Sequence, residues 1–228
     1  VSKFHTRKPL LSWALYDWAN SAFATTVMAG FFPAFFQRYW SLGVDPTVST
    51  SRLGIANGIA GFVVAALAPM LGAIADRCGR RKRFLVAWSL LGIVATALLW
   101  SVERGDWWMA TALFVAGTIG FAASNVFYDA LLLDVANDAE LDRASAFGYS
   151  LGYLGGGLLF AVNVLMTVKP AWFGLADAAE AVRVSFLMVA AWWFVFMLPL
   201  ALNVEEKPGE AGVTIGAATV AGLRELRA

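Results

Sequence analysis

The stretch Gly72-Ala73-Ile74-Ala75-Asp76-Arg77-Cys78-Gly79-Arg80-Arg81-Lys82-Arg83 separates two long apolar runs and decides the fold. Five of its last seven residues are basic. Basic residues collect in the short cytoplasmic loops of multi-pass membrane proteins. A cationic connection this short, between runs of membrane length, predicts a tight hairpin at the cytoplasmic face of a membrane.

The composition also indicates a membrane protein. Hydrophobic residues make up 60% of the 228 residues, charged residues make up 14%, and the mean hydropathy is +0.67. Soluble domains are roughly 45–50% apolar and about 25% charged. One core of this size cannot bury the excess, so lipid is expected to solvate much of it. The net charge of +1 identifies no partner.

The residue inventory excludes several kinds of chemistry. The chain has one histidine, His5, and one cysteine, Cys78, so a His/Cys metal site, a Cys–His catalytic pair and an internal disulfide are not expected. No glycine-rich phosphate loop and no nucleophile–base set is visible. The basic loop lacks interleaved aromatic residues, which disfavours nucleic acid. We therefore expect no enzyme, no cofactor and no metal.

Six apolar segments are long enough to cross a membrane as helices, because a span needs about 20 residues. We predict an all-α membrane protein with a cytoplasmic tail at 1–10, a six-helix domain at 11–202, and a second cytoplasmic tail or the start of a central linker at 203–228. The predicted spans are 11–36, 53–75, 84–101, 107–133, 146–168 and 184–202.

The distribution of basic residues predicts the orientation. With the N-terminus inside, twelve Lys and Arg residues fall in inner segments and five in outer segments. Both termini are therefore expected to be cytoplasmic. The chain starts at Val1 rather than Met and stops in a polar tail, so we expect it to be part of a longer protein.

The first span carries a polar face formed by Asp17, Asn20, Ser21 and Thr25. A carboxylate in the centre of a membrane costs about 2.5 kcal/mol or more, so Asp17 should face the bundle interior or a wet cavity. One interpretation is a binding site for a substrate ammonium group, a coupling proton, or both. The other is a buried Asp that only fixes helix packing.

The fourth span carries a second polar face, formed by Asn125, Tyr128 and Asp129. Asp129 is expected at a depth similar to that of Asp17, which would place two acids near an inner gate or cavity floor. The alternative is that Asp129 is solvated at the interface. Asp134 is expected to begin the following loop.

The basic loop has two interpretations. In the first, a gate forms at the inner surface, and Asp76 binds Arg80 or a neighbouring helix terminus; its residues are Gly72, Asp76, Arg77, Gly79 and Arg80. Alternatively, the loop only orients the chain and contacts anionic headgroups. Small residues also form ridges that permit close helix contacts; these are Gly54, Gly58, Gly61 and Gly72 in the second span, and Gly148, Gly152 and Gly156 in the fifth.

Several of these motifs resemble those of known families. The basic loop resembles the signature loop between the second and third helices of major facilitator superfamily transporters. The octapeptide from Tyr16 to Phe23 resembles the first helix of the fungal vacuolar amino-acid effluxer family linked to autophagy, and of its bacterial relatives. Segments 125–128 and 148–156 resemble the fourth and fifth helices of that family, so the resemblance covers about residues 11–202.

The resemblance implies a secondary transporter of twelve helices, of which this chain is the N-terminal half with its 3+3 helix repeat. The first and fourth helices would line the cavity, the second and fifth would meet the other half, and the third and sixth would face lipid. Asp129 departs from the family pattern, in which an Asn is expected.

The function that the resemblance implies is transport of a small solute by alternating access, with amino-acid efflux as an analogy. Expected partners are the solute, a coupling proton, membrane lipid, and either the missing six-helix half or a second copy. A bacterial inner membrane is favoured over a vacuolar membrane. The alternative function is a membrane receptor or scaffold that keeps the fold without transporting.

Overall fold

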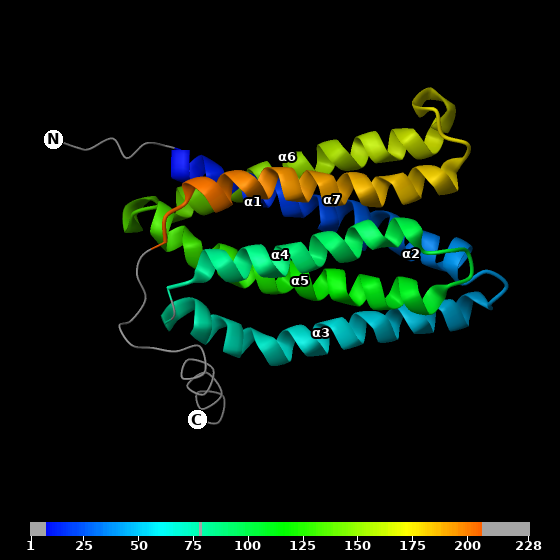
Figure 1. Ribbon diagram of the computed structural model, residues 1–228, viewed down its shortest axis with the longest axis horizontal. Helices are drawn as coiled ribbons and strands as arrows, with labels where there is room; N and C mark the ends of the chain where they lie inside the picture. The colour runs from blue at the N-terminus through cyan, green and yellow to red at the C-terminus, as the bar shows by residue number, and fades with distance from the viewer. Residues whose placement is uncertain (1–7, 78, 207–228) are drawn as a thin grey trace.

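The computed structural model describes residues 8–77 and 79–206, apart from the side chains of Asp76 and Arg77. Within these ranges the chain is helical and contains no strand. Long helical segments run side by side in alternating directions (Figure 1). Their bounds are α1 Lys8–Ala22, η1 Phe23–Phe31, α2 Phe32–Phe35, η2 Phe36–Trp40, α3 Pro46–Arg77, α4 Arg81–Leu98, η3 Leu99–Ser101, α5 Trp107–Val135, η4 Asp138–Glu140, α6 Leu141–Val168, η5 Pro170–Phe173 and α7 Ala178–Asn203.

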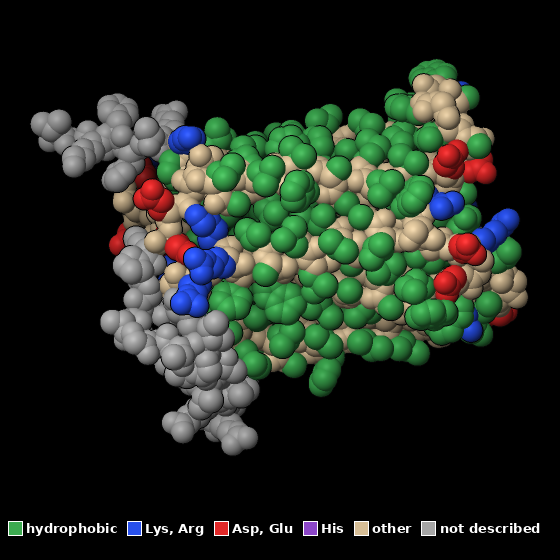
Figure 2. Space-filling view, in the orientation of Figure 1, with side chains coloured by type: hydrophobic (Ala, Val, Ile, Leu, Met, Phe, Trp, Pro, Cys, Tyr) green, Lys and Arg blue, Asp and Glu red, His purple; other side chains and the backbone are tan. Residues whose placement is uncertain are grey.

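The surface supports a membrane setting. Apolar side chains cover the middle of the visible face, and charged side chains gather at its two ends (Figure 2). Five helices of the described chain are long and apolar enough to cross a membrane. We call the end where α3 meets α4 the basic-loop end, and the end where α4 meets α5 the opposite end.

The first predicted span is not one α-helix, and in this respect the count of six was inexact. Its backbone stays helical, but the hydrogen bonding changes to the π pattern in η1 and η2. The Phe32 N–H donates to the Val27 carbonyl, five residues back. Pro33 has no N–H, and its ring excludes the carbonyl four residues earlier, so regular α bonding cannot continue there.

The helices pack in a defined order. α1 packs mainly on α6 and α7, α4 packs on α5 and α7, and α3 packs on α5. α3 therefore lies at one edge of the bundle (Figure 1). Near the opposite end, stacked rings fix the first segment: the ring centroids of Phe32 and Phe114 lie 4.0 Å apart, and those of Trp40 and Phe186 lie 5.8 Å apart.

Two helices that begin at the opposite end have side-chain caps. Asp45 precedes α3, and its Oδ1 accepts a hydrogen bond from the Thr47 N–H at 2.8 Å. Asp177 precedes α7 and accepts from the Glu180 N–H at 2.8 Å. The Glu180 carboxylate accepts in return from the Ala176 N–H. These bonds satisfy N–H groups that have no partner inside a helix, so they fix where each helix starts.

The two glycine ridges have different environments. Gly148, Gly152 and Gly156 of α6 are buried against α1. In contrast, a Cβ added at Gly54, Gly58, Gly61 or Gly72 of α3 would meet nothing within 4 Å. The predicted close helix approach is therefore present at α6, where its partner is the first span, and absent at α3 in this chain.

Candidate functional site

The α1–α6 contact positions the polar face of the first span. A Cβ at Gly152 would lie 2.7 Å from Ser21 Oγ and 2.8 Å from Asp17 Cγ, so only glycine leaves room for this pair. Ser21 Oγ donates to Asp17 Oδ1 at 3.1 Å. One turn further on, Thr25 Oγ1 donates to the carbonyls of Ser21 and Gly156. Asp17, Ser21 and Thr25 therefore lie on one face of the first segment, as their spacing predicts, and this face contacts α6.

The α1–α5 contact uses the remaining predicted residues. Asn20 is buried, and its Nδ2 donates to Asn125 Oδ1 at 2.5 Å. Trp13 Nε1 donates to the carbonyl of Tyr128 at 2.9 Å, and the two rings stack with centroids 4.4 Å apart. These bonds join the first and fourth spans, which are the two that carry polar faces.

Tyr128 is positioned differently from the other predicted binding residues. Its side chain is only 6% exposed, and its hydroxyl is buried without a hydrogen-bond partner. A Cβ at Gly148 would lie 2.8 Å from this hydroxyl. Because Gly148 and Gly152 lie one turn apart, the Tyr128 hydroxyl and the Asp17 carboxyl occupy neighbouring turns of the same α6 face.

Two carboxylates and two tyrosines share the accessible part of this region. Asp17 is half-buried and Asp129 is exposed. Asp17 packs against Gly152 of α6, which lies between Tyr149 and Tyr153 in the sequence, and Asp129 directly follows Tyr128 in α5. Tyr149 and Tyr153 are hydrogen-bonded through their hydroxyls at 3.0 Å and are 64% and 63% exposed. Neither tyrosine was predicted as a site residue from the sequence, although their i, i+4 spacing could have indicated a shared face.

The residues of the proposed gate are only partly described. Gly79 has φ +55°, which suits the tight turn between α3 and α4. Arg80 is exposed, and Gly72 has open space where a side chain would be. The side chains of Asp76 and Arg77 lie outside the described part of the chain, so their role stays a prediction.

An ion pair outside the predicted gate residues joins α4 to α5 at the basic-loop end. Arg81 Nη1 lies 2.9 Å from Asp134 Oδ2, and Arg81 Nε donates to the Ala75 carbonyl. The Asp134 side chain has no exposed surface. The prediction that Asp134 only begins a loop was wrong, because α5 extends to Val135 and places this carboxylate against the start of α4.

The segment after α7 binds the same end of α4. The Lys82 N–H donates to Glu206 Oε2 at 2.9 Å, and Lys82 Nζ donates to the Val204 carbonyl at 2.8 Å. The partners are 124 and 122 residues apart, which is why no local motif revealed them. Together with Arg81, these contacts join α3, α4, α5 and the end of α7.

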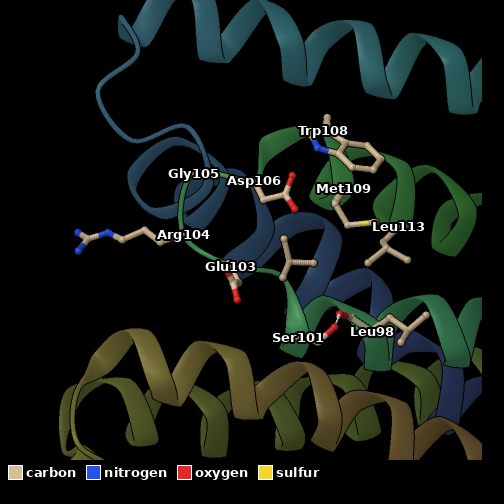
Figure 3. A pocket seen from close by; sticks show the side chains of 10 residues that line it. Leu98, Ser101, Glu103, Arg104, Gly105, Asp106, Trp108, Met109 and Leu113 are labelled. Atoms are coloured by element: carbon tan, nitrogen blue, oxygen red, sulfur yellow. Dashed lines mark hydrogen bonds between the residues drawn. The ribbon is translucent and has the colours of Figure 1, made fainter.

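A surface hollow of about 590 Å³ lies at the opposite end (Figure 3). The loop before α5 forms most of it, with Glu103, Arg104 and Asp106, and Trp108 and Met109 of α5 form one wall. Arg104 points away from the other labelled side chains. None of the predicted site residues lines this hollow. No group of three or more potential metal ligands occurs among the described residues.

The fold and the polar faces define the class as a multi-pass helical membrane protein with acidic residues inside its spans. Residues 42–228 match the family described as "Vacuole effluxer Atg22 like". The chain belongs to this family, which confirms the resemblance inferred from the first, fourth and fifth spans.

Similar proteins come from bacteria and fungi. The "Uncharacterized MFS-type transporter YxiO" of Bacillus subtilis is 35% identical over 198 residues, which are 86% of this chain and 46% of that protein. An uncharacterized protein of Aquifex aeolicus is 33% identical over 148 residues, covering 64% of this chain and 35% of that protein. "Autophagy-related protein 22-1" of Penicillium rubens is 32% identical over 69 residues, covering 29% of this chain and 10% of that protein. The chain thus spans half or less of the length of these relatives.

Proposed function

We propose that this chain is the N-terminal half of a secondary transporter that moves a small solute across a membrane by alternating access. In this proposal residues 11–202 form the transmembrane half, and residues 203–228 lead toward the second half. The observation that carries the proposal is the position of the polar side chains. Asp17 lies on the face of α1 that packs against Gly152 of α6, and Asp129 is exposed near the end of α5, directly after Tyr128.

Energetics support a functional role for these acids. A carboxylate in hydrocarbon is costly unless it faces a wet cavity or a partner. Asp129 forms no hydrogen bond or ion pair with any described residue, and Asp17 is bonded only by the Ser21 hydroxyl of its own helix. Packing alone therefore does not account for them. In the proposed site Asp17 binds the solute or a coupling proton, and Asn20, Ser21, Asn125 and Tyr128 support it.

The contacts at the basic-loop end support a gate there. Alternating access requires contacts that hold one conformation and break in the other. The bonds of Arg81 to Asp134 and to the Ala75 carbonyl, together with the Lys82–Glu206 contact, join four segments at this end. We propose that they form the latch together with Gly72, Asp76, Arg77, Gly79 and Arg80, and that this end is cytoplasmic.

We propose efflux as the direction of transport and amino acids, which the resemblance implies by analogy, as the first substrate class to test. Its description names a vacuole effluxer, and similar proteins occur in bacteria as well as fungi. A bacterial inner membrane is our proposed location, with lipid and either a second six-helix half or a second copy as partners. α3 supports the need for such a partner, because its glycine face is open in this chain.

The test uses the complete protein in proteoliposomes loaded with a radiolabelled amino-acid mixture. Efflux is measured with and without an imposed pH gradient. Asp17→Asn should abolish efflux, whereas Asp138→Asn, an exposed acid in η4, should leave it unchanged. Equal efflux with equal pH dependence in wild type and Asp17→Asn would remove Asp17 from the mechanism.

The alternative function is a receptor or scaffold that does not transport. One observation favours it: the Asn20–Asn125 and Trp13–Tyr128 bonds tie α1 to α5 inside the bundle, as a static packing role would require. That alternative predicts no solute flux in the proteoliposomes, together with loss of stability in Asn20→Ala.

A further inference from the structure

The region formed by Asp17 of α1, Asp129 of α5 and the two tyrosines of α6 carries an excess of negative charge. The Asp17 carboxyl and the Tyr128 hydroxyl lie one turn apart along α6, against Gly152 and Gly148, and Asp129 directly follows Tyr128 in α5. No lysine or arginine of the described chain pairs with either one, and the described ion pair, Arg81–Asp134, is a separate contact. Two neighbouring carboxylates repel each other, and a bound positive charge relieves that repulsion.

An independent observation at the same place indicates a missing ligand contact. The hydroxyl of Tyr128 is buried without a partner, in a residue that is 6% exposed. A buried polar group without a hydrogen bond is costly, so such a group needs an explanation in a native structure. Its position one turn from Asp17 along α6 places it at the edge of the acidic region.

The walls of the region fit an organic cation. Tyr149 and Tyr153 pack edge to face, with ring centroids 4.8 Å apart, and both rings are largely exposed. Tyrosine faces attract cations, and ammonium ligands are recognised in this way. The site offers two carboxylates and no third charged ligand among the described residues, which does not suit a metal ion.

From this geometry, and resting on the proposed transport function, we propose that Asp17, Asp129, Tyr149 and Tyr153 select a solute with a net positive charge. The ligand class is a primary amine cation with an apolar body. Its ammonium group lies between the two carboxylates, and its apolar part contacts the tyrosine rings. A zwitterion with the same side chain binds less well, because its own carboxylate meets two negative charges.

The test compares three ligands of one shape with different charges. Binding of phenethylamine, phenylalanine and 3-phenylpropionate to the complete protein in nanodiscs is measured by isothermal titration calorimetry. We expect phenethylamine to bind at least about tenfold more tightly than phenylalanine, and 3-phenylpropionate not to bind. Asp17→Asn and Asp129→Asn should each weaken phenethylamine binding about tenfold or more.

Two further variants control for folding and for the aromatic contact. Asp138→Asn, in η4, should bind phenethylamine as wild type does. Tyr153→Phe should retain most of the affinity, whereas Tyr153→Ala should lose it, because only the first keeps an aromatic face. Equal loss in both would contradict the aromatic contact.

The outcomes separate this inference from the proposed function. Tighter binding of phenylalanine, or binding of phenethylamine that is indifferent to both Asp variants, would overturn the inference. Asp17-dependent transport of the amino-acid mixture without binding of phenethylamine would mean that the acids bind a zwitterion or a proton. That result would overturn the cation proposal and support the transport proposal. The absence of both transport and binding would contradict the transport proposal and the cation proposal.

Discussion

At the residue scale, the basic-loop end shows how burial changes the role of a charged side chain. Arg81 begins α4 and Asp134 lies near the end of α5, 53 residues later in the sequence, yet their side chains form a pair that is 15% and 0% exposed. The second oxygen of Asp134 is buried without a hydrogen bond. Arg83, two residues after Arg81, is exposed. Two arginines of the same basic loop therefore differ in burial, and we expect them to contribute differently to the free energy of unfolding.

Removing one partner of the Arg81–Asp134 pair should destabilise the protein strongly. Asp134→Ala leaves the Arg81 guanidinium with a single carbonyl partner, and loss of one member of a buried pair costs about 3 kcal/mol. The measurement is thermal unfolding in detergent, followed by circular dichroism. The double variant Arg81→Ala/Asp134→Ala should be less destabilised than the sum of the single variants. Additive effects would show that the pair is not coupled, and Arg83→Ala should change little.

The cap of α3 should depend on pH. The Thr47 N–H donates to the Asp45 carboxylate, and this bond lowers the pKa of Asp45 below its ordinary value of 3.8. A lowered folded-state pKa means that the contribution is complete above the unfolded pKa and is lost as the pH falls through the folded pKa. Hydrogen exchange in the first turn of α3 should therefore rise below about pH 4 relative to the rest of the helix.

Asp45→Asn is the matched control for this prediction. Asn caps helices about as well as Asp but does not titrate in this range. The variant should show first-turn protection that does not change with pH. The same acid-induced loss in wild type and Asp45→Asn would mean that another group controls the start of α3.

At the scale of the helices, the sequence was most informative about where spans lie. The prediction of a span at 107–133 agrees with α5 at Trp107–Val135, and 84–101 agrees with α4 followed by η3. The span predicted at 53–75 is longer in the structure, where α3 begins at Pro46, because polar residues such as Ser49 and Arg52 continue the helix beyond the apolar run. Hydropathy detects the part of a helix that suits lipid and not its polar ends.

Other element features could not be predicted from one sequence. Pro33 accounts for the loss of regular α bonding near η1, but the hydropathy pattern does not predict the residues over which the π pattern extends. The glycine ridge of the fifth span predicted a close contact, but its partner was expected in the other half and is the first span of the same bundle. Among the candidate site residues, the Asn20–Asn125 bond joins two predicted faces, whereas the Tyr149–Tyr153 pair was not recognised.

The α6 ridge provides a test of helix packing. A Cβ at Gly155 would lie 2.6 Å from the Trp18 carbonyl oxygen, so Gly155→Ala must separate α1 from α6. We expect a loss of about 1–3 kcal/mol, as for other overpacked contacts. Gly157→Ala, two residues later, meets nothing within 4 Å and should be neutral or gain up to about 1 kcal/mol from helix propensity. Thermal unfolding of both variants measures the difference, and equal effects would contradict the close contact.

At the scale of the whole molecule, the helices divide by environment. α4 and α7 carry exposed apolar faces that suit lipid, with side chains such as Val94 and Phe194. The Asn20–Asn125 bond joins the polar faces of α1 and α5, and α6, which packs against Asp17 at Gly152, carries two exposed tyrosines, Tyr149 and Tyr153. In the proposed function, this polar side faces a second half of the transporter. The central claim is that this side meets water and not acyl chains.

Cysteine accessibility tests that claim most directly. In a Cys78→Ser background of the complete protein, Ser150→Cys and Tyr153→Cys place thiols on the polar side, and Val94→Cys places one on the predicted lipid side. Both Tyr153 and Val94 are exposed in this chain, at 63% and 54%, so simple burial does not distinguish them. A membrane-impermeant thiosulfonate reagent, applied to both sides of the membrane, should modify the thiols at 150 and 153 and leave the thiol at 94 unmodified. Failure to modify positions 150 and 153, with the protein folded, would contradict the account.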